Sequence, residues 1–510
     1  PELLRHFQEL YPYICVDEAQ DTSKIQHAII ALLASGSENL FMVGDEDQSI
    51  YGFRAAYPEA LLTFEKNYPD AKVLLMEENF RSDARIVLAA DRFIQKNTLR
   101  HEKHMKAARK PASDIREISL RSRKAQYTYL AKLAEGCTSQ TAILYRDNEC
   151  ILPLVDLLER NGIPYQMRNA ELSFFSHRTI LDIINIIKLA QNPMDTEAFL
   201  QIYYKIGTYL RKQDAIRIAR ISEEKRIPVL DVAAEDPDLN GHVLGSVRSM
   251  RTHLQNLLQD SGERALYRIM QYMGYQEYLN RSGLSDSKLE ILRILGSRAD
   301  SPMELAERLE QLKVLIREKE PDRKCPLILS TIHASKGLEY DSVYLIDVAD
   351  GILPESIPQN LHQASAEELK AYEEERRLFY VGVTRAKDHL TLFTTNRPST
   401  FCSEFLGKSS VTEEGRKNLM PVESRISRTF KQARPYAAVA GIRQTKASEE
   451  LYFRLKEELG TGVIVEHKKY GEGVVTQLDD RLVHIMFQDD TLRMMDLKIL
   501  ANAGLLKVKK

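Results

Sequence analysis

Two adjacent carboxylates follow a short apolar run close to the start of the sequence. In "YICVDEAQD" (residues 13–21), the apolar run leads directly into Asp17 and Glu18. The carboxyl ends of parallel strands are where open α/β sheets bind their ligands. One carboxylate can hold Mg²⁺, directly or through water, while its neighbour polarises an attacking water, and phosphoryl transfer to water requires both roles. We therefore predict that Asp17 is a Mg²⁺ ligand and that Glu18 is the general base.

A second apolar run is followed by a different set of side chains. The segment "MVGDEDQSIYGFRAA" (42–56) contains Gln48, Tyr51, Phe53 and Arg54 in quick succession. A carboxamide at the end of a strand can sense the γ-phosphate of a nucleotide or the attacking water. Aromatic rings beside an arginine can stack unpaired bases, and each stack is worth roughly 1–3 kcal/mol. The alternative interpretation is a surface turn with one buried aromatic residue.

Two arginines are candidates for stabilising a transferring phosphoryl group. Arg81 lies in "MEENFRS" (76–82), and Arg385 lies in "EEERRLFYVGVTRAKDHL" (373–390). A guanidinium that neutralises charge on the phosphoryl group can be worth about 10³–10⁵ in rate. For either arginine alone, an ordinary surface ion pair is the alternative.

The elements that must position these residues alternate between strands and helices. Strand patterns at 13–17, 40–45 and 72–76 are separated by helical patterns, which predicts a parallel sheet. A further set of strand patterns predicts a second sheet, with strands at 141–146, 327–333, 342–347 and 390–394. Strand patterns are absent between 177 and 320, where helical periodicity dominates. We predict a helical domain inserted into the second sheet, and independent successive domains are the alternative.

The C-terminal hundred residues differ in composition from the rest. Basic residues outnumber acids between 407 and 448, and we interpret 407–458 as a basic linker. A solvated tether and a weak nucleic-acid contact both remain open for it. In 459–510, short apolar runs alternate with Gly and Asp turns, a pattern typical of a small SH3-like barrel.

Composition and charge exclude several classes of protein. The 510 residues carry a formal net charge of −2, so nucleic-acid binding must rest on local features rather than on global basicity. No apolar run is long enough to predict a membrane span. Five scattered cysteines without a CxxC motif predict free thiols in a reducing cytosol. His101 and His104 lack a nearby third ligand, so we interpret them as solvated surface residues.

Five motifs together carry a resemblance to a known family. In order, they are "VDEAQD", "GDEDQSIYGFRAA", "EENFRS", "STIHASKGLEYDSVYLID" and "EEERRLFYVGVTRAK". They resemble motifs II to VI of the UvrD/PcrA/Rep family of superfamily 1 DNA helicases, over nearly the whole chain. The resemblance implies an α/β fold of RecA-like P-loop NTPase lobes. It assigns 1–75 to the C-terminal part of the first lobe, 76–176 and 321–406 to the halves of the second, 177–320 to the helical insertion, 407–458 to the linker and 459–510 to a Tudor/SH3-like barrel.

The same resemblance implies a role for each motif residue. Asp17 and Glu18 would be the Mg²⁺-associated and catalytic carboxylates, and Glu339 would hold the ribose of ATP. The γ-phosphate would be contacted by Gln48, Arg81 and Arg385. The path of single-stranded DNA would be lined by Tyr51, Phe53, Arg54, Thr331 and His333. Phe53 stands where many relatives have Trp, so weaker base stacking is expected, and this chain contains no Trp.

The function implied by the resemblance is that of an ATP-dependent helicase, with Mg²⁺ as cofactor. Such a protein moves 3′ to 5′ along single-stranded DNA, unwinds 3′-tailed duplexes and acts in DNA repair. The resemblance also implies contact with RNA polymerase through 459–510, no membrane association and a bacterial cytoplasmic location.

One motif of the family does not occur within these residues. A phosphate-cradling GxxxxGK[ST] loop should precede "VDEAQD", and the nearest mimic, "CSEFLGKSS" (402–410), has Cys402 in place of the first glycine. We therefore expect residues 1–510 alone to hydrolyse ATP negligibly, and the complete protein to be a DNA-stimulated ATPase. The alternative is an ATPase-dead module that binds DNA or RNA polymerase.

Overall fold

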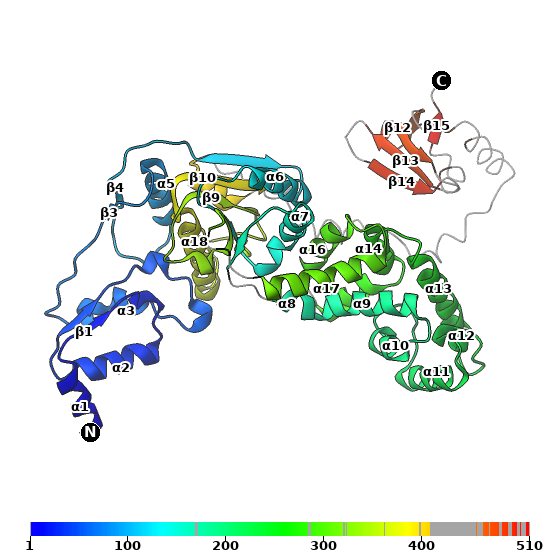
Figure 1. Cartoon of the computed structure of the whole chain (residues 1–510), viewed down its shortest axis with the longest axis horizontal. Helices are drawn as coiled ribbons and strands as arrows, with labels where there is room; N and C mark the ends of the chain where they lie inside the picture. Colours follow the sequence, from blue (N-terminus) through cyan, green and yellow to red (C-terminus); the bar gives the residue numbers. More distant parts are fainter. Residues whose placement is uncertain are drawn as a thin grey trace. The chain divides into compact units, whose positions relative to one another are not determined.

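The computed structural model describes residues 2–168, 172–283, 287–319, 322, 324–361, 363–396, 399–408, 455, 459, 463–468, 470–478, 482–487, 492–496, 500 and 506–508. The chain divides into two compact units, Pro1–Ser410 and Val411–Lys510. The first unit has three parts (Figure 1). We name them the N-terminal segment (2–75), the sheet region (76–168 and 324–408) and the helical segment (172–319).

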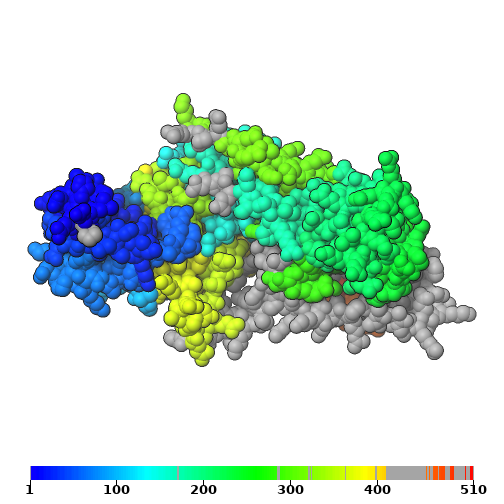
Figure 2. Space-filling view, turned by 90° about the horizontal axis from the view of Figure 1, so that it is seen from below, coloured from blue at the N-terminus to red at the C-terminus, as the bar shows by residue number. Residues whose placement is uncertain are grey.

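The N-terminal segment contains a small parallel sheet flanked by helices. Strands β1 (Ile14–Val16) and β2 (Leu40–Met42) pair in parallel, with Ile14 opposite Leu40. Helix α2 connects them and starts at a capping box formed by Ser23 and Gln26. The helices of this segment are α1 (Glu2–Leu10), α2 (Lys24–Ala34), α3 (Glu59–Leu62) and α4 (Phe64–Asn67). In Figure 2 its blue surface lies against the yellow surface of the sheet region.

The prediction of a strand at residues 72–76 is wrong. The chain is irregular there, and Leu74 and Met76 are each 84% exposed. An apolar run becomes a strand only where a neighbouring strand accepts its backbone hydrogen bonds. Within the described residues, no strand pairs with these five residues.

The sheet region is built on six parallel strands in the order β5-β10-β9-β6-β8-β7. The four strands predicted for this sheet are confirmed as β6, β8, β9 and β10, and β5 and β7 were not predicted. The bounds are β5 (Arg116–Leu120), β6 (Thr141–Tyr145), β7 (Gln166–Met167), β8 (Leu327–Thr331), β9 (Tyr340–Leu345) and β10 (Ala386–Thr395). A separate parallel pair consists of β3 (Glu78–Asn79) and β4 (Lys106–Ala107).

Both faces of the six-stranded sheet are covered. Along β6, Ile143 and Tyr145 belong to one hydrophobic core, and Ala142 and Leu144 belong to the other. Strands buried on both faces are typical of parallel sheets with helices on each side. The helices of this region are α5 (Ala84–Ile94), α6 (Arg123–Glu135), α7 (Leu152–Arg160), α18 (Ala366–Val383) and α19 (Thr400–Phe405).

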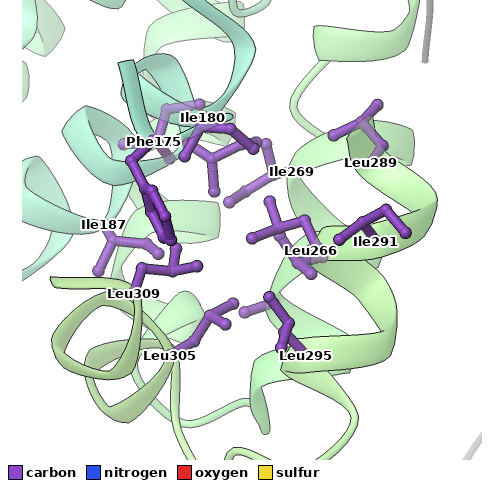
Figure 3. Close-up of a cluster of buried hydrophobic side chains, with 14 of the residues drawn as sticks. Phe175, Ile180, Ile187, Leu266, Ile269, Leu289, Ile291, Leu295, Leu305 and Leu309 are labelled. Atoms are coloured by element: carbon purple, nitrogen blue, oxygen red, sulfur yellow. The ribbon is translucent and has the colours of Figure 1, made fainter. Parts of the chain in front are cut away.

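All regular elements described between β7 and β8 are helices. Their core includes Ile180, Ile187, Ile269 and Leu305 and is shown in Figure 3. The same hydrophobic cluster continues into Tyr145 on β6. The helices are α8 (Ser173–Ser176), α9 (Arg178–Gln191), α10 (Thr196–Ile202), α11 (Lys212–Lys225), α12 (Val229–Ala234), α13 (Gly241–Leu257), α14 (Gly262–Gln271), α15 (Tyr275–Ser282), α16 (Ser287–Gly296) and α17 (Pro302–Glu318).

The second unit contains a five-stranded antiparallel sheet in the order β14-β13-β12-β11-β15. Its core includes Val465, Val475, Ile485 and Phe487. The strands are β11 (Ile464–His467), β12 (Gly471–Leu478), β13 (Leu482–Phe487), β14 (Leu492–Asp496) and β15 (Leu506–Val508). The predicted basic linker 407–458 lies almost entirely outside the described residues. Of its described residues, Lys408 forms an ion pair with Glu117 in the sheet region.

None of the helices in the described part of the chain combines the length and apolar character needed to cross a membrane.

Candidate functional site

The carboxyl ends of β1 and β2 form one edge that carries the predicted catalytic residues. The Val43 amide donates to the Val16 carbonyl (2.8 Å), and the Ala19 amide donates to the Val43 carbonyl (3.0 Å). These bonds hold Asp17 and Glu18 beside the turn that begins at Asp45. The structure therefore brings the two predicted carboxylates next to the segment that carries Gln48.

Gln20 joins the two strand ends and was not predicted. Its Nε2 donates to Glu18 Oε2 (2.5 Å), and its Oε1 accepts from the Asp45 amide (3.0 Å). The side chain is 1% exposed. A Cβ at Gly44 would lie only 2.6 Å from Gln20 Oε1, so the glycine leaves space for this carboxamide. Gln20 thus fixes the position of the Glu18 carboxylate.

Asp17 is suited to hold Mg²⁺. One of its oxygens accepts from the Glu18 amide (2.9 Å), and no cation lies within ion-pair distance of it among the described residues. In that part of the chain, no three metal-ligating side chains gather in one place. Mg²⁺ commonly binds one or two carboxylates together with phosphate oxygens and waters, so a single exposed aspartate fits this ion.

The Glu18 backbone adopts a left-handed conformation with φ of 50°, which is uncommon for residues other than glycine and often marks functional sites. Its carboxylate faces Lys336, whose Nζ lies 3.5 Å from Glu18 Oε2. Lys336 also donates to Asp21 Oδ2 (2.6 Å) and to the Gln48 carbonyl (2.7 Å). This lysine belongs to the sheet region, so it connects the carboxyl ends of β1 and β2 to that region.

Arg385 reaches the same edge from the sheet region. It lies between α18 and β10, is 1% exposed, and donates from Nη2 to Gln48 Oε1 (3.3 Å). Its Nε donates to the Val381 carbonyl (3.0 Å), which fixes the guanidinium. Burial and the nearby Arg81 charge lower the pKa of Arg385 to about 10, so it stays charged at neutral pH. Gln48 and Arg385, which the resemblance predicted to contact the same phosphate, are therefore in contact with each other.

Arg81 and Glu339 are paired with each other. Arg81 Nε lies 3.0 Å from Glu339 Oε2, and Lys387 Nζ lies 3.1 Å from Glu339 Oε1. The two cations lower the pKa of the Glu339 carboxyl, chiefly through their hydrogen bonds. All three side chains are partly exposed. They form a charged cluster at the ends of β3, β9 and β10, close enough to Arg385 for Arg81 to affect its pKa.

Four of the five residues predicted to contact DNA form one cluster. Phe53 and Arg54 are exposed, and Tyr51 and His333 are partly buried. Tyr51 Oη donates to the His333 carbonyl (3.1 Å), and the Phe53 and His333 rings lie edge to face with centroids 5.6 Å apart. The Arg54 guanidinium lies 4.9 Å from the Tyr51 ring centroid. Phe53 is 69% exposed. We call Tyr51, Phe53, Arg54 and His333 the aromatic platform.

Thr331 is the predicted DNA contact that lies outside this platform. It ends β8 and is buried, and its hydroxyl accepts from the Ala334 amide (3.1 Å). That bond shapes the turn that carries His333. In the structure, Thr331 therefore positions the platform rather than forming part of its exposed surface.

Comparison with known families matches both halves of this arrangement. Residues 1–69 match the model of the UvrD/REP helicase N-terminal domain, and residues 74–397 match that of the UvrD-like helicase C-terminal domain. The second match covers more than half of the chain. The chain belongs to the UvrD-like helicase family.

Curated relatives of this UvrD-like helicase chain come from bacteria. It is 31% identical over 409 residues to the "Putative ATP-dependent DNA helicase YjcD" of Bacillus subtilis, covering 77% of this chain and 53% of the relative. It is 28% identical over 516 residues to the ATP-dependent DNA helicase PcrA of Staphylococcus epidermidis, covering 94% and 68%. The PcrA of Staphylococcus aureus is 26% identical over 518 residues. The chain thus spans about half the length of YjcD and about two thirds of that of PcrA.

Two residues of this UvrD-like helicase chain join the candidate site only in the structure. Gln20 and Lys336 both lie inside quoted motifs, so their positions in "VDEAQD" and "HASKGLE" were available as a signal. The sequence did not show which residues Lys336 contacts. Lys336 meets residues more than 280 positions away, and only the fold brings them together.

Proposed function

We propose that this protein is an ATP-dependent helicase that moves 3′ to 5′ along single-stranded DNA. The direction of movement is what the resemblance to the family implies, and one observation supports the coupling of ATP hydrolysis to DNA movement. Gln48 and Tyr51 are three residues apart, and each contacts the sheet region. Gln48 Oε1 meets Arg385 Nη2 at 3.3 Å, and Tyr51 Oη meets the His333 carbonyl at 3.1 Å. A single short segment thus belongs to the candidate ATP site and to the candidate DNA site, so a movement at one must reach the other.

In this proposal each motif side chain has a distinct role in ATP hydrolysis or in movement of the DNA strand. Asp17 would hold Mg²⁺, which would supply positive charge next to the phosphates of ATP. Glu18, oriented by Gln20, accepts the proton of the attacking water, while Arg385 and Arg81 stabilise charge on the phosphoryl group. Gln48 senses that group, and Glu339 leaves its ion pairs to hold the ribose. Repeated opening and closing moves the bound strand past Phe53 by one base, which unwinds a 3′-tailed duplex.

ATP hydrolysis gives the direct test. We expect residues 1–510, which lack GxxxxGK[ST], to hydrolyse ATP negligibly with or without single-stranded DNA. The full-length product of the gene should hydrolyse ATP when DNA is added, and Glu18→Gln should abolish this activity. Strong ATP hydrolysis by residues 1–510 that is lost in Glu18→Gln would contradict the expectation that these residues alone are inactive. A full-length product without DNA-stimulated turnover would favour the ATPase-dead module that binds DNA or RNA polymerase.

A second candidate function concerns the second unit, for which we propose a closed SH3- or Tudor-like barrel that binds RNA polymerase. Ile464 on β11 pairs with Val474 on β12, which pairs with Met486 on β13, and all three side chains are exposed. An apolar stripe across three strands favours a protein partner. Triple replacement of these residues by serine should abolish co-purification with RNA polymerase core. Undiminished binding would exclude this stripe as the docking surface.

We further infer a role in DNA repair in the bacterial cytoplasm. The relatives are bacterial, and all five cysteines of the chain are free thiols. Deletion of the gene should sensitise its host to ultraviolet light, and a complementing Glu18→Gln copy should not restore survival.

A further inference from the structure

Three consecutive acids in the N-terminal segment are held by two cations of the sheet region. Asp45, Glu46 and Asp47 open the turn that carries Gln48, and Glu46 and Asp47 are buried. Lys103 Nζ lies 2.6 Å from Asp45 Oδ1, 3.0 Å from Glu46 Oε1 and 3.3 Å from Asp47 Oδ2. This acidic turn therefore depends on a lysine more than fifty residues away.

Arg100 adds a second connection to the same turn. Its Nε and Nη2 donate to the two oxygens of Asp47 at 3.0 and 2.9 Å, and its side chain is 5% exposed. The Glu46 carboxylate also accepts from the His101 amide (2.8 Å). His101 thus lies beside the acidic turn rather than as a solvated residue, whereas His104 is exposed as expected.

Asp45 passes this constraint to Gln48. Its Oδ1 receives Lys103, and its Oδ2 accepts from Gln48 Nε2 at 2.7 Å. An ionised carboxylate can only accept hydrogen bonds, so the end of the carboxamide that meets Asp45 must be its NH₂ group. The oxygen end is then directed at Arg385, which can only donate (3.3 Å). The chemistry of the two neighbours thus allows one orientation of the amide.

Lys103 is the cation that holds the Asp45 carboxylate in place. The nearby carboxylates outweigh the effect of burial and raise the pKa of Lys103 above its ordinary value. The lysine therefore stays protonated throughout the neutral range. Without it, Asp45 would keep the hydrogen bond from the Asp47 amide (3.1 Å) but lose its cation. The carboxylate that accepts from Gln48 Nε2 would then be less constrained, and the Gln48 amide would be oriented chiefly by Arg385.

We propose that Lys103 is a positioning residue that fixes, through Asp45, the orientation of the Gln48 carboxamide. The inference rests on the proposed function in one respect, since it treats Gln48 as the residue that senses the phosphoryl group. The geometry itself, from Lys103 through Asp45 and Gln48 to Arg385, stands without it. Loop 97–105 of the sheet region, which carries Lys103, thereby influences the role of Gln48 in the turn after β2.

The orientation is tested by nuclear magnetic resonance on residues 1–510 labelled with ¹⁵N-glutamine. The side-chain NH₂ signals of Gln48 are identified by their loss in Gln48→Ala. They should shift in Lys103→Met and stay near their original position in Lys103→Arg. The control Lys106→Met removes a nearby lysine that is 72% exposed and, among the residues that the structure describes, pairs only with Glu77; it should leave the Gln48 signals unchanged. A Gln48 signal that does not move in Lys103→Met overturns the proposal.

Asp45→Asn guards against misfolding of the lysine variant. It keeps the shape of the side chain but adds a donor, so the Gln48 amide can bind it in either orientation. The Gln48 signals should shift or double in this variant. Signals identical to those of the unsubstituted chain would contradict the proposed link through Asp45.

Turnover provides the readout that a merely structural role would not move. In the full-length product of the gene, Lys103→Met should lower kcat for DNA-stimulated ATP hydrolysis about 10–100-fold, as for other misplaced catalytic groups, and leave single-stranded DNA affinity unchanged. In a Gln48→Ala background, Lys103→Met should cause no further loss. An equal loss in both backgrounds overturns the proposal. If the unsubstituted protein shows no turnover, the proposed function fails, and the Gln48 signals still decide the inference.

Discussion

Tyr51 and His333 are 282 positions apart in the sequence, yet the Tyr51 hydroxyl donates to the His333 carbonyl at 3.1 Å. This bond joins a turn after β2 to the turn after β8. Phe53 and Arg54 complete the aromatic platform around it. The platform exists only when the N-terminal segment and the sheet region are in contact, so its properties report on that contact.

Removal of the Phe53 ring should weaken binding of single-stranded DNA. The ring is 69% exposed, and loss of one stacked base costs roughly 1–3 kcal/mol. Fluorescence anisotropy with a labelled oligonucleotide should show weaker binding by Phe53→Ala and tighter binding by Phe53→Trp, which has a larger ring. Phe41→Ala, at another exposed phenylalanine, is the control. Equal effects of Phe41→Ala and Phe53→Ala would contradict base stacking on the platform.

His333 should make the first unit less stable in mild acid. Burial, with smaller contributions from Arg146 and Arg54, lowers the pKa of His333 from 6.5 to about 4. The unfolded chain then binds more protons between these values, so stability is full above pH 6.5 and falls as the pH falls toward 4. The loss between pH 7 and pH 5 should be about 2 kcal/mol.

Urea unfolding at both pH values measures this loss in the unsubstituted chain and in His333→Gln. The difference between the two proteins isolates the histidine from other titrating groups. The variant should lose less stability on acidification. Identical losses would mean that His333 does not titrate as its surroundings indicate.

Asp347 should be far more important for stability than an exposed acid. It is fully buried at the end of β9 and accepts two hydrogen bonds from Arg123 (2.9 and 2.6 Å) and one from Gln126 (2.8 Å). Asp347→Ala breaks this buried pair and leaves Arg123 with the partly exposed Glu290 (3.3 Å) as its ion-pair partner, which should cost about 3 kcal/mol. Glu224→Ala breaks an exposed helix pair with Arg220 (2.8 Å) and should cost at most about 0.5 kcal/mol. Denaturant unfolding of both variants decides between these values.

Gly52 should be needed for contact between the N-terminal segment and α18. Its amide donates to Glu374 Oε1 (2.8 Å), and a Cβ at this position would lie 2.4 Å from Glu374 Oε2. Gly52→Ala should therefore displace the carboxylate and cost about 1 kcal/mol, the value of one hydrogen bond. In a Glu374→Ala background the same change should cost nothing further. A full cost in that background would place the strain elsewhere.

Local sequence patterns were sufficient for most of the elements. The apolar runs at 141–146 and 342–347 became β6 and β9, and the helical periodicity between 177 and 320 became the helices α8 to α17. The run at 72–76 is also largely apolar, but it has no strand to pair with among the described residues, and it is irregular. Composition reports the tendency to form a strand, whereas the neighbouring strand decides whether it forms.

The residues of the candidate site likewise fall into those that the sequence predicted and those that only the structure revealed. The resemblance pointed to Glu18, Gln48 and Arg385, because each stands inside a recognisable motif. Lys336 and Lys103 were missed because their importance lies in ion pairs with residues 50 to 320 positions away. Lys336 also stands inside a motif, but lysines in polar loops are usually solvated, and the local sequence does not show which partners either lysine meets. Only the structure, with the N-terminal segment in contact with the sheet region, shows those partners.

The shared core of the helical segment and the sheet region has a consequence for how this chain can change. Tyr145 on β6 and Leu305 on α17 belong to one apolar cluster, although 160 positions separate them. A shortened chain that joined residue 176 to residue 321 would leave part of that cluster facing water. Such a deletion should yield insoluble protein rather than a smaller working one. The helices between β7 and β8 therefore fold together with the sheet and cannot be deleted as an independent domain.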